Sequence, residues 1–597
     1  GIHALNADPN IAALQAYTID LLPEIEKESG QSIGLHMTGG MTLAGTPDRW
    51  EWLQSAYRTF QSIGIDDCRL ITPEEAGELC PIMSTDGILG GMWADREGYV
   101  DTTGTVHAYA GAAKKHGAEI VENNRVLALN QTANGWEVVT EKGTIQTEHV
   151  VNAAGLWAKQ VGRMAGVELP VSPLNHHYLI SDTIPELEAL DFEVPMTVDL
   201  EGFTYMRQDQ KGILLGIYEV DHEHWMVDGA PWEYGFELQQ ENTDRIEKEL
   251  VLGFERYPAL QDVGVKTWVN GAFTFSPDGN PLVGPVQGKP GYWCACAVMA
   301  GFLQGGGVGK SLAEWMIHGE PEADVFGMDV SRYGDFAQNK RFIKETTGQF
   351  YSRRFIMTYP NEQLPAGRPL KMAPAYSDMT AAGCRWGVSY GLEVPLYFAP
   401  EGSAEKPSLK RSNAFDIVAE ECRAVREDVG LLDISGFSRF EVTGDGAEAW
   451  LNHVMASKLP AAGRARLAPM LSGEGKMKGD LTVFNWGDGT WWIMGSYYLR
   501  DWHKRWFADH MLEAVEVRDV SDAMVGFSLS GPNSTKVFER VTDGPVDLPF
   551  MGCATMDVGL IRAKVGRLSV TGELGYEIHC SAAEHIGLRK LLLKAGA

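Results

Sequence analysis

The sequence has little cysteine, no long apolar run and a shortage of positive charge. Eight cysteines in 597 residues are too few for a disulfide scaffold, so we expect a reducing compartment. No stretch approaches the roughly 18 apolar residues that cross a bilayer, so we expect no membrane partner. The 51 lysines and arginines stand against 80 aspartates and glutamates, which argues against nucleic acid because phosphate backbones select basic surfaces. We therefore expect a soluble protein of roughly three or more domains.

A convincing metal-binding pattern is also missing. Cys294 and Cys296 lie two residues apart, on one face of a strand, but two ligands do not make a site. We interpret them as buried residues of a core strand. His222 and His224 have the same spacing without a third ligand nearby, and we interpret their segment as a solvated loop. The sequence therefore predicts no metal.

Two nucleotide-binding patterns fail as well. No G-x-G-x-x-G follows an opening strand, so either the protein binds no dinucleotide or its first strand lies before Gly1. Residues 305–311, GGGVGKS, resemble a phosphate-binding loop, but Gln304 stands where the first glycine is needed, which argues against ATP. The chain begins without Met or a charged leader, and we interpret it as a fragment.

What is present begins with the order of the predicted elements. Residues 11–28 have helical apolar spacing, with Pro23 inside. Residues 125–149 read as three short strands around two tight turns, and residues 150–166 as strand, small-residue turn and helix. Small residues at such a turn let the backbone approach a phosphate or a ring. A tight connection without ligand explains this one segment equally well.

Residues 291–318 repeat the pattern of strand, glycine-rich turn and helix. The N–H groups and the positive end of such a helix suit an anionic ring, such as a reduced flavin. His176 and Tyr205 lie in a β-rich, aromatic stretch and by themselves predict packed, hydrogen-bonded side chains. Asp480 after a glycine-rich turn and Glu573 in a Thr-Gly-Glu turn are weak signals when taken alone.

Both halves of the chain carry motifs in a recognisable order. The first half contains VNAAGLWAKQVGRMAGV, LEGFTYMRQ, VNGAFTFSPDGNPLVGP, GGGVGKSLAEWMIHGEP, SRYGDF and PAGRP. The second half contains AVREDVGLLDISGFSRFEVTG, APMLSGEGKMKGDLTV, LSGPNS and LSVTGELGYEIH. Together these segments resemble the family of dimethylglycine and sarcosine dehydrogenases, and those of the second half resemble its folate-binding half and the glycine-cleavage aminomethyltransferase. The resemblance covers essentially the whole chain.

The fold that the resemblance implies is a multidomain protein of mixed α/β and α+β class. Residues 1–325 are expected to form an FAD-binding domain of the amino-acid-oxidase type that lacks its N-terminal Rossmann strand. Residues 326–380 are expected to form a linking domain. Residues 381–597 are expected to form a β-rich, aminomethyltransferase-like folate-binding domain that is truncated at its C-terminal end.

The resemblance also assigns cofactor-binding residues. Val126 matches a position near the adenine, and the other FAD-binding positions are Asn152, Ala153, Ala154, Gly155 and Trp157 in one turn and Met299, Gly301, Gln304, Gly305, Gly306 and Gly307 at the flavin ring. The family links its flavin covalently to a histidine in a W-H-x-A-G segment, and Gly1 matches the last glycine of that segment. The linking histidine is therefore expected before residue 1. His3 is out of register and is not assigned.

The expected catalytic residues are His176, Tyr205 and Asp480. Hydride leaves an N-methyl carbon only when the amine lone pair is free, and His176 and Tyr205 match the family residues that hold the amine and tune its protonation. Asp480 matches the acid of the folate domain. The expected folate contacts are Ser569, Gly572, Glu573 and Tyr576, with the Glu573 carboxylate accepting paired N–H bonds from the pterin.

The function implied is oxidation of dimethylglycine to sarcosine by FAD. The one-carbon unit is expected to be trapped by tetrahydrofolate as 5,10-methylenetetrahydrofolate. The alternatives are a sarcosine dehydrogenase, a dehydrogenase or oxidase of another N-methyl amino acid, and a non-catalytic folate-binding protein. The expected electron acceptor is an electron-transfer flavoprotein or oxygen. The expected location is the bacterial cytoplasm or the mitochondrial matrix.

Overall fold

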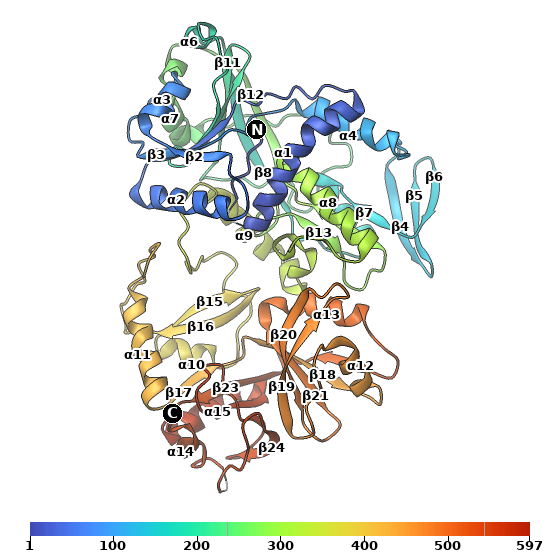
Figure 1. Ribbon diagram of the computed structural model, residues 1–597, viewed down its shortest axis with the longest axis vertical. Coiled ribbons are helices and arrows are strands. Elements are labelled where there is room, and N and C mark those ends of the chain that lie inside the picture. Colours follow the sequence, from blue (N-terminus) through green and yellow to red (C-terminus); the bar gives the residue numbers. More distant parts are fainter. Residues whose placement is uncertain (7, 236, 543) are drawn as a thin grey trace. The chain divides into compact units, whose positions relative to one another are not determined.

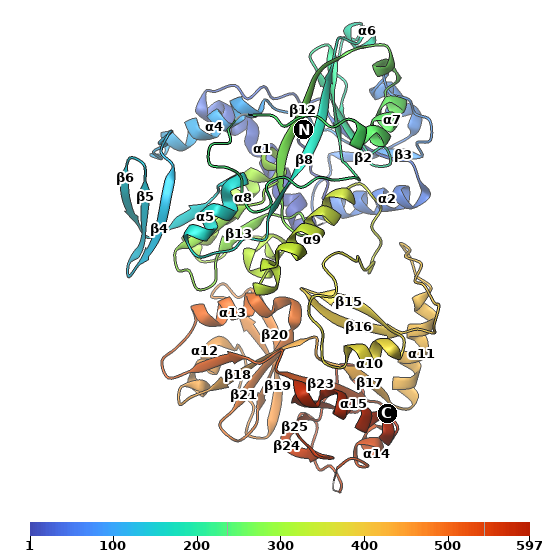
Figure 2. The ribbon, with the colours of Figure 1, turned by 180° about the vertical axis from the view of Figure 1, so that it is seen from behind.

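The computed structural model describes residues 1–6, 8–235, 237–542 and 544–597 (Figures 1 and 2). The chain divides into two compact units. The first unit comprises residues 1–330 and 337–358, and the second comprises residues 331–336 and 359–597.

An eight-stranded sheet organises the first unit. Its strand order is β12-β8-β11-β10-β9-β1-β3-β2, with bounds β1 Gly40–Ala44, β2 Cys68–Ile71, β3 Gly90–Ala94, β8 Ser172–Ser181, β9 Met196–Asp199, β10 Thr204–Asp209, β11 Gly212–Ile217 and β12 Val265–Phe275. Helices α3 (Pro73–Leu79) and α7 (Glu247–Arg256) contribute to a core cluster with the buried side chains of Leu179, Met206 and Leu215. Leu179 and Met206 alternate with half-buried neighbours along β8 and β10, as expected where the two faces of a sheet differ in environment. The other face of β8 and β10 carries His176 and Tyr205.

A smaller layer contains the predicted cofactor-binding turns. Strands β13 (Leu282–Pro285), β14 (Tyr292–Cys296) and β7 (Val150–Asn152) form a three-stranded sheet. Strands β4 (Val126–Thr132), β5 (Gly135–Thr140) and β6 (Gly143–Thr147) form the antiparallel meander that the sequence predicts. Cys294 and Cys296 are buried on β14, which confirms their interpretation as core residues.

The first unit also contains helices α2 (Pro47–Ser62), α4 (Thr102–Lys115), α5 (Ala158–Met164) and α6 (Pro185–Glu188). The predicted helix 11–28 is α1 (Pro9–Ser29), and Pro23 lies within it without ending it. Asp8 begins α1 by accepting hydrogen bonds from the main-chain N–H groups of Asn10 and Ile11 at 2.8 and 3.3 Å. Helix α1 packs along α8 (Gly301–His318), beside which it lies in Figure 1. Helix α9 (Lys340–Ser352) returns to pack against β8.

The second unit contains two five-stranded sheets. One has the order β17-β23-β26-β25-β24 and the other β19-β20-β21-β18-β22. Their bounds are β17 Gly430–Asp433, β18 Phe437–Thr443, β19 Arg464–Leu471, β20 Met477–Asn485, β21 Trp491–Ser496, β22 Glu516–Asp519, β23 Met524–Ser530, β24 Cys553–Val558, β25 Ile561–Gly566 and β26 Gly575–Ser581. A hairpin of β15 (Cys384–Ser389) and β16 (Leu392–Phe398) precedes them, and the helices are α10 Tyr376–Ala381, α11 Ala414–Glu427, α12 Ala447–Val454, α13 Arg500–Asp509, α14 Ser534–Phe538 and α15 His585–Ala595.

Candidate functional site

Two short connections lie at one edge of the three-stranded sheet. Strands β7 and β14 run parallel, with Asn152 opposite Cys294, so their carboxyl ends share that edge. The Ala153–Gly155 turn follows β7, and residues 297–300 follow β14 and lead into α8. Ligands of open α/β sheets bind outside the carboxyl ends of parallel strands. This edge is where the chain can accept an extended nucleotide cofactor.

Asn152 holds the first turn in place and does not reach outward. Its buried side chain accepts a hydrogen bond from Ala154 N at 3.1 Å and donates to Ala158 O and Tyr292 Oη at 2.9 and 3.0 Å. The exposed groups of this turn are therefore the main chain of Ala153 and of Gly155, whose φ is +53°. Two other predicted FAD residues lie outside the turn. Trp157 donates from its indole N–H to Pro231 O at 2.9 Å, and Val126 begins β4 half-buried.

The glycine-rich segment forms no turn, which corrects the sequence-based expectation. Gly305, Gly306 and Gly307 lie inside α8, which begins earlier, at Gly301. Packing explains the helix: a Cβ at Gly307 would come within 2.6 Å of Leu14 Cβ in α1, and one at Gly306 within 3.1 Å of Thr18. These two glycines therefore allow α1 and α8 to approach closely.

The remaining predicted residues of α8 differ in their surroundings. A Cβ at Gly301 or at Gly305 would meet no atom within 4 Å. Gln304 is buried and donates to Gln15 Oε1 at 3.3 Å.

The first turn of α8 is the part of this helix that fits a flavin ring. No side chain caps it at Ala300, and the first N–H groups of a helix together carry a partial positive charge. Met299 packs in one cluster with Tyr218, Phe273 and Tyr351. Ala300 packs in another cluster with the N-terminal segment that contains Ile2 and Ala4. The chain thus supplies small residues and free main-chain donors next to an aromatic wall, a setting that suits FAD.

That aromatic wall is centred on His176 of β8. Its Nε2 lies 2.9 Å from Tyr205 Oη, and its Nδ1 lies 2.8 Å from Tyr351 Oη. The His176 and Tyr205 rings are parallel to within 2°, and Tyr218 meets His176 edge-on with ring centres 5.1 Å apart. The structure therefore brings His176 and Tyr205 together, as the resemblance implies. Tyr218 and Tyr351 are additional members of the cluster.

The ionisation states of the cluster follow from its burial. Burial lowers the pKa of His176 to about 4, against the opposing charge of Glu219, so its imidazole is neutral at pH 7. Burial also raises the pKa of Tyr205 and of Tyr351 above the ordinary value, so both phenols keep their hydrogens. His3 in the N-terminal segment is neutral too, because burial first and the charge of Arg354 second lower its pKa to about 3. At neutral pH the site offers uncharged hydrogen-bonding groups.

A charged network supports the strand next to this site. His177 Nδ1 lies 2.6 Å from Glu219 Oε1, and Arg245 donates to the second oxygen of that carboxylate at 2.5 Å. Burial disfavours ionisation of Glu219, but the hydrogen bond from His177 and the charge of Arg245 give a lowered pKa. His177 also accepts the main-chain N–H of Asn242 at 3.2 Å. This network orients β8 at the residue that follows His176.

Sequence reasoning missed Tyr218 and Tyr351 for different reasons. Tyr218 follows the last residue of β11 and faces His176. The alternation of side chains between the two faces of a strand could therefore have predicted its position. Tyr351 lies in α9, within the segment interpreted as a linking domain, where nothing local indicates contact with β8. Its position is decided by tertiary packing.

The predicted folate residues lie on separate elements of the second unit. Asp480 is exposed in the interior of β20, which begins at Met477. Glu573 forms an ion pair with Arg426 at 3.0 Å. Ser569 donates to the main-chain oxygen of Glu573 at 2.5 Å and so fixes the turn. Within the parts of the unit that the structure describes, no hydrogen bond or ion pair joins Asp480 to the turn of Glu573.

The other two predicted folate residues have structural surroundings. Gly572 is exposed with φ of +77°, a conformation that suits glycine. Tyr576 is buried in the core of the second unit, where its hydroxyl lies 2.9 Å from Thr535 Oγ1. This environment is typical of a packing residue.

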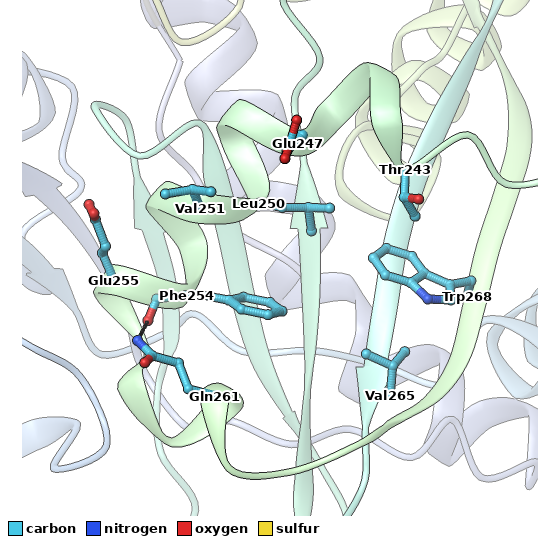
Figure 3. A pocket seen from close by; sticks show the side chains of 9 residues that line it. All are labelled: Thr243, Glu247, Leu250, Val251, Phe254, Glu255, Gln261, Val265 and Trp268. Atoms are coloured by element: carbon cyan, nitrogen blue, oxygen red, sulfur yellow. Dashed lines mark hydrogen bonds between the residues drawn. The ribbon is translucent and has the colours of Figure 1, made fainter.

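A hollow of about 630 Å³ lies elsewhere on the first unit, between α7 and the start of β12 (Figure 3). Leu250, Phe254 and Trp268 line it, with acidic Glu247 and Glu255 on the helix. It contains none of the predicted site residues.

Among residues 1–6, 8–235, 237–542 and 544–597, no group of three or more His, Cys, Asp or Glu side chains is arranged to hold a metal ion. Across the same ranges, no helix has both the length and the apolar character needed to span a bilayer.

Comparison with family models gives the class of each part of the chain. Residues 1–315 match the family "FAD dependent oxidoreductase", and residues 318–373 match "FAD dependent oxidoreductase central domain". Residues 375–597 match "GCVT N-terminal domain".

Individual relatives agree with this class. The chain is 31% identical to dimethylglycine dehydrogenase of Rattus norvegicus, over 98% of this chain and 70% of the relative. It is 28% identical to sarcosine dehydrogenase of Homo sapiens, over 96% of this chain and 68% of the relative. It is 27% identical to a formaldehyde-forming 4-methylaminobutanoate oxidase of Paenarthrobacter nicotinovorans, over 98% of this chain and 71% of the relative.

The chain therefore belongs to the FAD-dependent oxidoreductase family that includes the dimethylglycine and sarcosine dehydrogenases. This confirms the resemblance and the expected class of enzyme. It also confirms the order of the fold, an amino-acid-oxidase-type FAD domain followed by an aminomethyltransferase-like domain. The assigned site residues stay predictions.

Proposed function

We propose that the protein oxidises an N-methyl amino acid, with dimethylglycine as the first candidate, and that FAD accepts the hydride. The observation that carries the proposal is the position of Met299, just before α8, in one packed cluster with Tyr218 and Tyr351, which contact His176. This arrangement supports an amine-binding role for the aromatic wall, which lies next to a helix start that suits a flavin. FAD would supply hydride acceptance from the N-methyl carbon.

The residues of this chain would hold and orient the substrate. His176 and Tyr205 are uncharged at pH 7, so they bind the amine by hydrogen bonds and not by an ion pair. The neutral amine keeps the lone pair that must form the C=N bond as hydride leaves. Tyr218 and Phe273 pack against the His176 ring and share a cluster with Met299. These side chains would exclude water and so protect the iminium product from hydrolysis.

We further propose that the second unit binds tetrahydrofolate through Asp480 and the Ser569–Glu573 turn. The product would then be sarcosine and 5,10-methylenetetrahydrofolate. The match of residues 375–597 to the GCVT domain supports this assignment. Domain limits of 1–325, 326–380 and 381–597, and a covalent link from FAD to a histidine before residue 1, belong to the same proposal.

The deciding experiment is anaerobic reduction of the flavin in the full-length holoenzyme. Dimethylglycine should bleach the flavin absorbance in a single turnover, and colourless protein without FAD would refute the proposal. A non-catalytic folate-binding protein would retain tetrahydrofolate but show no bleaching with any amine. Adding an electron-transfer flavoprotein or oxygen to the reduced enzyme then identifies the acceptor by the rate of reoxidation.

Sarcosine and longer N-methyl amino acids are the second candidates. The sarcosine dehydrogenase and the 4-methylaminobutanoate oxidase among the relatives favour testing both. One methyl group changes binding by about 1–3 kcal/mol, so the comparison must be quantitative. Initial rates of flavin reduction with dimethylglycine, sarcosine and 4-methylaminobutanoate rank the three. If the rate with sarcosine is higher than the rate with dimethylglycine, sarcosine becomes the assigned substrate.

A further inference from the structure

His176 is held between two tyrosine hydroxyls, one at each ring nitrogen. Tyr205 Oη lies 2.9 Å from Nε2, and Tyr351 Oη lies 2.8 Å from Nδ1. A hydroxyl can donate or accept, so the distances alone do not give the direction of either bond. The direction matters because it decides what Tyr205 offers to a bound amine.

The surroundings of Tyr351 settle the first direction. Its side chain is fully buried. Among the described residues, His176 Nδ1 is the hydrogen-bond partner of its hydroxyl, so Nδ1 is the acceptor available to the hydroxyl hydrogen. A buried donor without an acceptor is costly, so Tyr351 donates to Nδ1.

The second direction follows from the charge of His176. Its imidazole is neutral at pH 7, because burial lowers its pKa to about 4. A neutral ring whose Nδ1 accepts must carry its hydrogen on Nε2. Nε2–H therefore donates to Tyr205 Oη. The O–H of Tyr205 remains available to a ligand, because among the described residues His176 is the hydrogen-bond partner of that hydroxyl.

We propose that Tyr351 is a positioning residue that acts through His176 to make Tyr205 a hydrogen-bond donor toward the substrate amine. A donor hydroxyl selects the neutral amine, whose lone pair can accept a hydrogen bond that breaks as the C=N bond forms, over the ammonium ion, which has no lone pair. In the opposite tautomer, Tyr205 would donate its hydrogen to Nε2. Its oxygen would then offer the substrate only acceptor lone pairs, which favour the ammonium form. This inference rests on the proposed oxidation of an N-methyl amine and adds how the site selects the reactive form.

The kinetic test is the pH profile of flavin reduction by dimethylglycine in the full-length holoenzyme. Tyr351→Phe removes the donor to Nδ1, and we expect the acid limb of the profile to move to higher pH by about one unit. Tyr109→Phe is the matched control, because the buried Tyr109 hydroxyl has no hydrogen-bond partner in the described structure, and its profile should overlay the wild type. An unchanged acid limb in Tyr351→Phe, with full FAD content, would overturn the proposal.

A second measurement does not depend on turnover. Solid-state 15N NMR of the holoenzyme labelled at histidine, with His176→Gln to identify the resonances, reports which ring nitrogen carries the hydrogen. We expect a neutral ring protonated at Nε2 in the wild type and a change of both ring signals in Tyr351→Phe. A hydrogen on Nδ1 in the wild type would overturn the inference. If no N-methyl amine reduces the flavin, the proposed function fails, while this spectrum still decides the tautomer.

Discussion

The ring of Tyr205 lies over Gly216, its cross-strand partner in β10 and β11. A Cβ at residue 216 would come within 1.9 Å of Tyr205 Cζ and 2.3 Å of its hydroxyl oxygen. The absence of a side chain at Gly216 is therefore what lets Tyr205 lie flat on the sheet and reach His176 at 2.9 Å.

The first prediction concerns Gly216. In Gly216→Ala the Tyr205 ring must move away from the sheet, which breaks its hydrogen bond to His176. We expect a loss of stability of about 1–3 kcal/mol from overpacking and a slower reduction of the flavin by substrate. Thermal unfolding and single-turnover absorbance measure the two effects. Wild-type rates in Gly216→Ala would show that the position of Tyr205 does not matter for oxidation.

The second prediction separates the glycines of α8. Gly307→Ala should destabilise the first unit by about 1–3 kcal/mol, because its Cβ would meet Leu14 Cβ and Leu14 O at 2.6 and 2.7 Å. Gly305→Ala has open space and should stabilise the helix by about 0.5–1 kcal/mol. Thermal unfolding of the pair tests this contrast. Equal shifts of the unfolding temperature in the two variants would contradict the packing role of Gly307. Reduced FAD content in Gly305→Ala would support the assignment of Gly305 to the flavin site.

The sequence predicted the elements of the first unit better than the ends of those elements. The helix of residues 11–28, the meander and the small-residue turn after Asn152 are determined locally by apolar periodicity and by turn residues, and the structure contains them. The glycine-rich segment after β14 was misread because local rules assign consecutive glycines to a turn. Its helical state depends on α1, which lies nearly 300 residues earlier in the chain and supplies Leu14 and Thr18 as neighbours.

The candidate site likewise contains residues that local motifs identify and residues that only tertiary packing brings into place. His176 and Tyr205 were assigned through motif resemblance, whereas Tyr351 comes from α9 and meets His176 through a fold-level contact. Sequence spacing carries no information on a contact across 175 residues. The same holds for Tyr576, whose burial and hydrogen bond to Thr535 depend on how the sheet of the second unit packs.

The third prediction concerns the pH dependence of stability in the second unit. Glu577 is buried in β26, and burial raises its pKa from 4.5 to about 7, against the opposing charge of Arg439. The folded state therefore binds a proton more tightly than the unfolded state. Stability from this group is fully present below about pH 4.5 and is lost as the pH rises through about 7.

Glu577→Gln removes this titration and should flatten the stability profile between about pH 4.5 and 7. The difference of 2.5 units between the two pKa values (7 − 4.5) sets an upper limit of about 3 kcal/mol. Chemical denaturation followed by tryptophan fluorescence at several pH values measures it. Asp557→Asn, an exposed carboxylate of β24 in the same sheet, is the control. A profile of equal slope in Glu577→Gln and the wild type would contradict the assignment.

The last prediction is that oxidation and folate chemistry can be separated by single substitutions. Asp480 is exposed on β20, and its proposed role is to orient folate and manage its proton. Asp480→Ala should leave flavin reduction by dimethylglycine nearly unchanged. It should lower the yield of methylenetetrahydrofolate on the order of 10²-fold and raise free formaldehyde, because untrapped iminium hydrolyses in water. Tyr205→Phe should do the reverse, slowing flavin reduction while folate binding persists.

The control for Asp480 is Glu474→Ala, which removes an exposed carboxylate from the turn between β19 and β20. The assay follows flavin absorbance, methylenetetrahydrofolate and formaldehyde together, with an artificial electron acceptor so that the natural acceptor does not limit the rate. If Asp480 is a surface carboxylate without a role, both products keep their wild-type yields in Asp480→Ala, as they should in Glu474→Ala. If Asp480→Ala slows flavin reduction itself, the assignment of this residue to the folate half alone is wrong.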